Sequence, residues 1–152
     1  MRILALLMLL VASPAFAQDS PLVGSWKLVN YKFIFDNDPP TELFGARPNG
    51  VLILTREGRM VGLVTAETRK AGTGDAERVG LYKTLVAYSG KYRVEGNAFV
   101  TTVDMSWNEA WNGTEQRRFW KIEDGKLFIE SAPDTAPNGR MLVTRLVWER
   151  DK

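Results

Sequence analysis

From Leu22 onward, the sequence consists of short segments rich in Val, Ile, Thr, Tyr, Phe and Trp, separated by clusters of Gly, Asn, Asp and Pro. This pattern is typical of an all-β protein, because β-branched and aromatic side chains favour strands. Glu57-Gly58, Gly96-Asn97 and Asp124-Gly125 predict two-residue hairpins, so neighbouring strands should be antiparallel and follow sequence order. We expect strands over residues 24–36, 50–56, 59–65, 88–95, 98–105, 114–123, 126–132 and 140–150.

An open antiparallel sheet leaves two unpaired edges, and closure into a barrel removes them. We therefore predict an all-β fold, an eight-stranded antiparallel up-and-down barrel of the size that holds packed side chains or one small ligand. The proline-containing residues 36–49 should form an irregular loop at the barrel mouth. Helical spacing of apolar residues predicts a short helix over 75–87 that covers one end, and a helical turn over 106–112.

The N-terminal end of the chain resembles a secretory signal peptide. Arg2 supplies a positive charge, residues 3–12 are apolar, and Ala15-Phe16-Ala17 has the small-x-small pattern of a cleavage site. The apolar run is shorter than the roughly 20 residues that cross a bilayer, and no later stretch is long enough. We expect residues 1–17 to be removed and residues 18–152 to be an exported single domain, periplasmic or secreted, without a transmembrane segment.

The chain has no cysteine and no histidine, which excludes several classes of function. No disulfide can form, zinc, copper and haem lack their usual ligands, and Ser-His-Asp and Cys-His catalysis are impossible. The formal net charge of +2 falls to +1 without Arg2, and the charges form no run. We therefore expect no nucleic-acid partner, no metal and no cofactor.

Strand alternation identifies the side chains that point into the barrel. In residues 88–95, for example, Tyr88 and Tyr92 share one face, and the charged side chains share the other. The complete inward set is Trp26, Leu28, Asn30, Tyr88, Gly90, Tyr92, Val94, Phe99, Thr101, Val103, Met105, Thr114, Gln116, Arg118, Trp120, Ile122, Leu127, Ile129, Leu142, Thr144, Leu146 and Trp148.

Arg118 stands out in this set, because a buried guanidinium is costly unless it meets an anion or a full set of acceptors. One interpretation is that Arg118, with Gln116 and a tyrosine hydroxyl, binds the carboxylate or carbonyl of an otherwise apolar molecule. The other is an internal salt bridge or a backbone-capping network that holds the barrel closed. The predicted ligand-binding residues are Arg118, Gln116, Tyr88, Tyr92, Asn30, Trp107, Trp111, Trp120 and Thr144.

Two tryptophans, Trp107 and Trp111, lie four residues apart in the helical turn predicted over 106–112. They form either a hydrophobic cluster beneath a loop or an aromatic lip at the mouth of the cavity. The sequence leaves both interpretations open.

Several segments together resemble a known family. Gly24-Ser25-Trp26 opens the first strand, and residues 145–150 (RLVWER) close the last one. With residues 22–31, 48–60, 87–96 and 111–119, they make the chain similar to the small bacterial and fungal lipocalin-like domain proteins of the lipocalin, or calycin, superfamily. The resemblance implies a barrel and small hydrophobic ligands, with Trp26 closing one end beneath Arg145 or Arg150 and Gly24 beside it. It implies no catalytic motif.

Three functions are consistent with these features. The leading hypothesis is an exported, non-enzymatic protein whose barrel binds a small, mostly apolar molecule, with Arg118 orienting the polar end. The alternative is a cofactor-free cyclase or isomerase, in which Tyr88 or Tyr92 is the acid and Arg118 stabilises developing negative charge. The third is an envelope structural or stress protein without a ligand.

Overall fold

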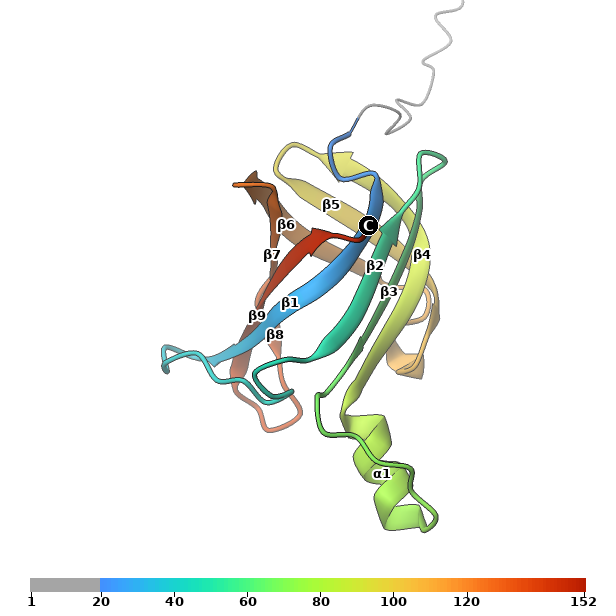
Figure 1. The fold of residues 1–152 in the computed structure, drawn as a ribbon, viewed down its shortest axis with the longest axis vertical. Helices are drawn as coiled ribbons and strands as arrows, with labels where there is room; N and C mark the ends of the chain where they lie inside the picture. The colour runs from blue at the N-terminus through green and yellow to red at the C-terminus, as the bar shows by residue number, and fades with distance from the viewer. Residues whose placement is uncertain (1–19) are drawn as a thin grey trace, which may run out of the picture.

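The computed structural model describes residues 20–152, so the predicted signal peptide lies outside the described residues. Strands account for most of the regular structure in this part of the chain (Figure 1). In chain order the elements are β1 (Gly24–Phe35), β2 (Asn49–Leu54), β3 (Arg59–Thr65), α1 (Asp75–Lys83), β4 (Leu85–Glu95), β5 (Ala98–Ser106), η1 (Glu109–Trp111, a 3₁₀ turn), β6 (Glu115–Glu123), β7 (Lys126–Ser131), β8 (Asp134–Thr135) and β9 (Met141–Arg150).

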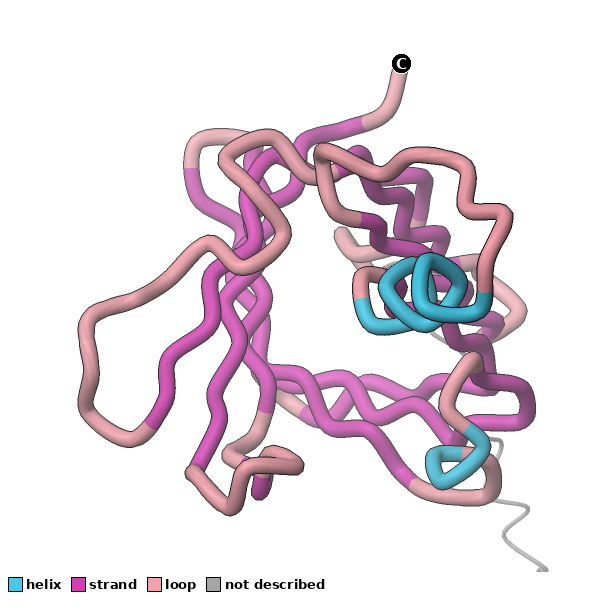
Figure 2. Tube along the Cα trace, turned by 90° about the horizontal axis from the view of Figure 1, so that it is seen from below, coloured by secondary structure: helices cyan, strands magenta, loops and turns pink. Residues whose placement is uncertain are grey.

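The eight long strands form a closed antiparallel barrel, which confirms the predicted fold class. Each strand from β1 to β6 pairs with the next, β7 pairs with β9, and β9 pairs back with β1. Figure 2 shows the resulting ring of strands. The two-residue β8 pairs with β9 alone. Each long strand therefore has a neighbour on both sides, as the edge argument requires.

Tight turns join three pairs of neighbouring strands, β2–β3, β4–β5 and β6–β7. Asp124 and Gly125 link β6 to β7 with φ angles of 50° and 72°, the positive values that a two-residue primed turn requires. Residues 96 and 97 likewise connect β4 to β5. The predicted two-residue hairpin at residues 57–58 is wrong, because β2 ends early and residues 55–58 form a four-residue β-turn. In that turn the Gly58 N–H donates to the Thr55 carbonyl oxygen (3.2 Å).

A bulge in β1 reverses the inward face halfway along the strand. Leu28 and Asn30 pair with consecutive residues of β9, which makes Val29 an extra residue. Asn30 therefore points outward, where its side-chain amide donates to the Glu42 carboxylate (3.1 Å), and Tyr31 points inward. The predicted inward position of Asn30 is wrong, because alternation identifies a face only while the register is unbroken.

A second bulge lies between β4 and β5. Gly90 pairs with Val103 and Ser89 pairs with Met105, so Asp104 is the extra residue. Val103 is buried, but Met105 points outward and is 65% exposed. The predicted inward position of Met105 is therefore wrong for the same reason as that of Asn30.

The helix α1 is shorter than predicted and is placed differently. It ends at Lys83, because the chain from Leu85 onward pairs with β3, so the expected helix over 75–87 is wrong in its last turn. None of its residues is buried, and Figure 1 shows it extending from the end of the barrel instead of covering it. Within residues 20–152, neither helical segment has the length and hydropathy that a membrane crossing requires.

Trp26, Gly24 and Arg150 pack together at the opposite end of the barrel. The Arg150 guanidinium carbon lies 3.8 Å from the centroid of the Trp26 ring. Its Nη1 donates to the Val23 carbonyl oxygen and its Nη2 to that of Pro21, both at 2.7 Å. Gly24 has a φ of +137°, and a β-carbon at this position would overlap Nη1 of Arg150. Glycine is therefore required beneath the arginine.

The sequence proposed two arginines for this position, and the structure distinguishes them. Arg145 lies on the outer surface, where its Nε forms an exposed ion pair with Glu130 (2.6 Å). Arg150 is the residue that covers Trp26.

Candidate functional site

The barrel contains a cavity of about 810 Å³, within the size range of small-molecule sites. All eight long strands contribute to its wall, and most of the side chains facing it are aliphatic or aromatic. The large aromatic residues of the interior therefore do not fill the barrel. The apolar wall includes Phe33, Leu52, Met60, Val64, Val86, Phe99, Ile129, Leu142 and Leu146.

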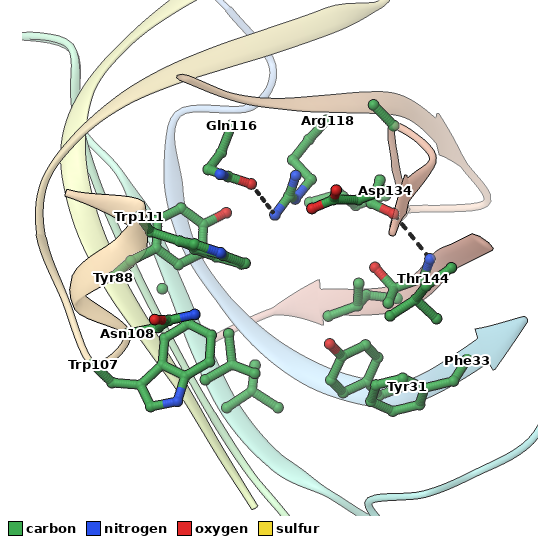
Figure 3. Close-up of a pocket in the computed structure, with 18 of the residues that line it drawn as sticks. Tyr31, Phe33, Tyr88, Trp107, Asn108, Trp111, Gln116, Arg118, Asp134 and Thr144 are labelled. Atoms are coloured by element: carbon green, nitrogen blue, oxygen red, sulfur yellow. Dashed lines mark hydrogen bonds between the residues drawn. The ribbon is translucent and has the colours of Figure 1, made fainter. Parts of the chain in front are cut away.

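Arg118 projects from β6 into this cavity (Figure 3). Its Nη1 donates to the Arg117 carbonyl oxygen (2.9 Å) and its Nη2 to Oε1 of Gln116 (3.3 Å). Within residues 20–152, no carboxylate forms an ion pair with it. A guanidinium has five N–H groups, so several remain without a partner in this part of the chain. The salt bridge that the sequence left open is absent among these residues, and the capping interpretation accounts for one carbonyl contact only.

Three aromatic rings form the wall beside Arg118. The Tyr88 and Trp111 ring centroids are 5.3 Å apart, and those of Trp107 and Trp111 are 4.9 Å apart, both pairs in edge-to-face geometry. The Arg118 guanidinium carbon lies 5.8 Å from the Tyr88 centroid and 5.9 Å from that of Trp111. Trp107 and Trp111 therefore pack as a cluster and also line the cavity, so both interpretations of this pair apply.

Tyr31, which the sequence analysis missed, lines the cavity from β1. It is 7% exposed, and its ring packs on those of Phe33 (4.3 Å) and Phe44 (5.2 Å). Burial raises the pKa of Tyr31 well above its usual range, and the nearby charge of Arg118 offsets part of this rise. A signal was present in the sequence, because the aromatic residues 31, 33 and 35 alternate out of phase with Trp26 and Leu28.

The structure brings six of the predicted ligand-binding residues to the cavity wall and leaves three away from it. The six are Arg118, Gln116, Tyr88, Trp107, Trp111 and Thr144. The hydroxyl of Tyr92 donates to the Thr55 carbonyl oxygen (2.9 Å), and Tyr92 does not line the cavity. Asn30 borders a second hollow, together with outward-facing side chains such as Lys32 and Phe128. Trp120 also borders this hollow, and it packs against the buried core instead of lining the cavity.

Comparison with known proteins places the chain in a family. Residues 23–151 match the family model described as a lipocalin-like domain. The chain belongs to the lipocalin-like domain family. The resemblance inferred from the sequence is thereby confirmed. A crystal structure at 2.60 Å resolution of an uncharacterized protein from Bacteroides eggerthii DSM 20697 is similar, with 14% identity, a TM-score of 0.42, and coverage of 85% of this chain and 98% of that one. No curated protein matches the sequence.

In this lipocalin-like barrel, the loop of residues 36–48 reaches the rim of the cavity. Phe44 is buried and lines the cavity, and Thr41 exchanges two backbone hydrogen bonds with Phe33, both at 2.9 Å. The backbone N–H and the Nε of Arg47 donate to the Glu67 carboxylate, both at 3.1 Å, which lowers the pKa of Glu67. The loop is thus connected both to β1 and to the segment that follows β3.

Two carboxylates border the lipocalin-like cavity without reaching Arg118. Glu115 is bound by Arg93 (2.7 Å and 3.2 Å), and this contact lowers the pKa of Glu115. Asp134 lies exposed in β8. Within the described range 20–152, acidic side chains do not gather in groups of three or more that could hold a metal ion. Among the described residues, the cavity thus presents the guanidinium of Arg118 without an ion-pair partner, several hydroxyl groups and an apolar wall.

Proposed function

We propose that this lipocalin-like protein binds one small, largely apolar molecule in the barrel and holds its carboxylate or carbonyl end at Arg118, without chemical turnover. The observation that carries the proposal is a guanidinium in an apolar cavity with no carboxylate partner in residues 20–152. The guanidinium is partly buried beside an apolar wall, and an anionic ligand supplies the missing opposite charge. Charge-assisted hydrogen bonds to a carboxylate also suit the guanidinium fork.

The dimensions of the cavity support a ligand with an apolar body. Each methylene group removed from water contributes about 0.8 kcal/mol, so a chain of ten carbons supplies several kcal/mol towards binding. Phe99, Ile129 and Leu146 are buried or nearly so, and they give the body of such a molecule a continuous apolar surface. The lipocalin-like fold is consistent with this role.

We also infer that the protein acts outside the cytoplasm, since residues 1–17 have the pattern of a signal peptide. N-terminal sequencing of protein purified from the host tests this inference. We expect the mature chain to start at Gln18. A protein that retains Met1 would contradict export through this signal.

Isothermal titration calorimetry tests the binding role, with dodecanoic acid and dodecan-1-ol as a matched pair of ligands. The chain from residue 18 should bind the acid, and Arg118→Met should weaken this binding by about 10- to 100-fold, the range for a charged hydrogen bond. The alcohol should lose less affinity, because it carries no charge.

Arg145→Met is the control variant, since Arg145 is an exposed arginine on the outer surface. It should leave both affinities unchanged. If Arg118→Met binds the acid as tightly as the unmodified protein does, Arg118 does not hold the polar end. If the unmodified protein binds neither ligand, while native mass spectrometry of protein from its own host shows no bound molecule, the binding function itself is wrong.

A further inference from the structure

The Tyr31 hydroxyl is a further polar group that faces the cavity, in addition to Arg118. Tyr31 is more than nine-tenths buried, and Figure 3 shows its hydroxyl directed at the open centre of the cavity. The ring cannot easily turn away, because Phe33 and Phe44 pack on it. A buried hydroxyl that is held in one orientation needs a partner for its proton.

The Tyr31 hydroxyl has one side-chain hydrogen-bond partner in the described part of the chain. This partner is Thr144, a diagonal neighbour of Tyr31 across the β1–β9 pair, and its hydroxyl lowers the Tyr31 pKa slightly against the larger effect of burial. A phenol hydroxyl has one proton and two lone pairs, so this contact leaves part of its hydrogen-bonding capacity directed at the cavity. Because burial keeps the phenol protonated, Tyr31 remains a donor at every physiological pH.

Tyr31 and Arg118 belong to different walls of the barrel. Three strand-to-strand steps, from β6 through β7 and β9 to β1, separate them, which is about 14 Å along the wall at the usual strand spacing. Figure 3 shows the two side chains entering the cavity from opposite sides, with open space between their tips. They are nevertheless close enough for the charge of Arg118 to act on the phenol.

We propose that the ligand is an oxygenated acid, whose carboxylate binds Arg118 and whose second oxygen, a hydroxyl or carbonyl near the carboxylate, accepts the Tyr31 O–H. If the second oxygen of the ligand is a hydroxyl, it can also accept a hydrogen bond from the Thr144 hydroxyl or donate one to it. Tyr31 is then the residue that distinguishes an oxygenated acid from a plain one. This inference rests on the proposed binding function and adds the ligand class.

The test compares dodecanoic acid with dodecanoic acids that carry a hydroxyl on carbon 2, 3, 4 or 5, by isothermal titration calorimetry. At least one hydroxy acid should bind the unmodified chain from residue 18 about two- to tenfold tighter than the plain acid, the value of one neutral hydrogen bond. Tyr31→Phe keeps the ring contacts with Phe33 and Phe44, so it should abolish this preference by lowering the affinity for the hydroxy acid to that for the plain acid. Arg118→Met should weaken the binding of both acids.

Tyr92→Phe is the matched control, because it removes a buried phenol hydroxyl that bonds to Thr55 and not to the cavity. It should preserve the preference for the hydroxy acid. If no hydroxy acid binds more tightly than the plain acid, or if Tyr31→Phe weakens both equally, the second-oxygen inference is overturned while the binding function stands. Failure of every acid to bind the unmodified protein would instead remove the proposed function itself.

Discussion

Gly24→Ala should destabilise the barrel through Arg150, and the coupling between these two residues can be measured. The φ of Gly24 is +137°, which L side chains rarely adopt, and a strained backbone residue costs about 1–3 kcal/mol. The added β-carbon would also occupy the place of the Arg150 Nη1 atom, so the guanidinium has to leave the Trp26 ring.

The contacts of Arg150 set the size of the second effect. Its cation–π contact with Trp26 contributes about 0.5–1 kcal/mol, and each of its two hydrogen bonds to carbonyl oxygens about 0.5–1.5 kcal/mol. Arg150→Ala should therefore lower the free energy of unfolding by about 1.5–4 kcal/mol, and Gly24→Ala by about 2.5–7 kcal/mol. The double variant should lose no more than Gly24→Ala alone, because the Arg150 contacts can be lost only once.

Urea denaturation followed by tryptophan fluorescence measures these free energies. The expected departure from additivity equals the Arg150 contribution, about 1.5–4 kcal/mol. Additive losses would refute the reasoning, because they would show that the added β-carbon does not act through Arg150. Arg145→Ala is the control for arginine removal, and it should cost about 0.5 kcal/mol or less, since its pair with Glu130 is exposed.

Three further predictions concern the bulge, a turn and pH. Met105→Ser should change the free energy of unfolding by less than about 0.5 kcal/mol, whereas Val103→Ser should cost about 2–4 kcal/mol; equal losses in urea titrations would contradict the bulge. Gly125→Ala should lower the free energy of unfolding by about 1 kcal/mol, because φ is 72°, and an unchanged melting temperature would disprove this. Hydrogen bonds from arginine lower the pKa of carboxyl groups such as that of Asp36, so these groups stabilise the fold fully above their unfolded-state pKa of about 4, and this stability is lost as the pH falls through the lower folded-state pKa. Because the chain has no histidine, the free energy of unfolding should be constant from pH 6 to 8. Urea midpoints measured across this pH range test the prediction.

Most of the fold could be predicted from the strand pattern, because strand formation depends on the local preferences of the residues. β-branched and aromatic segments, and turns such as Asp124-Gly125, are favoured by residues close together in the sequence, so the strand order and the barrel followed from them. Arg118 was also found this way, since the alternation in β6 runs without a break. Where alternation was interrupted, at Asn30 and Met105, the prediction of the inward face failed.

The sequence by itself determined the strands, the inward arginine of β6 and the family to which the chain is similar. Only the tertiary structure decided that Arg150 covers Trp26, that Tyr31 faces Arg118 across the cavity, and that Tyr92 does not. The physical reason is that bulges and pairings between distant strands depend on which backbone groups meet when the barrel closes, and no local preference of a single strand contains that information.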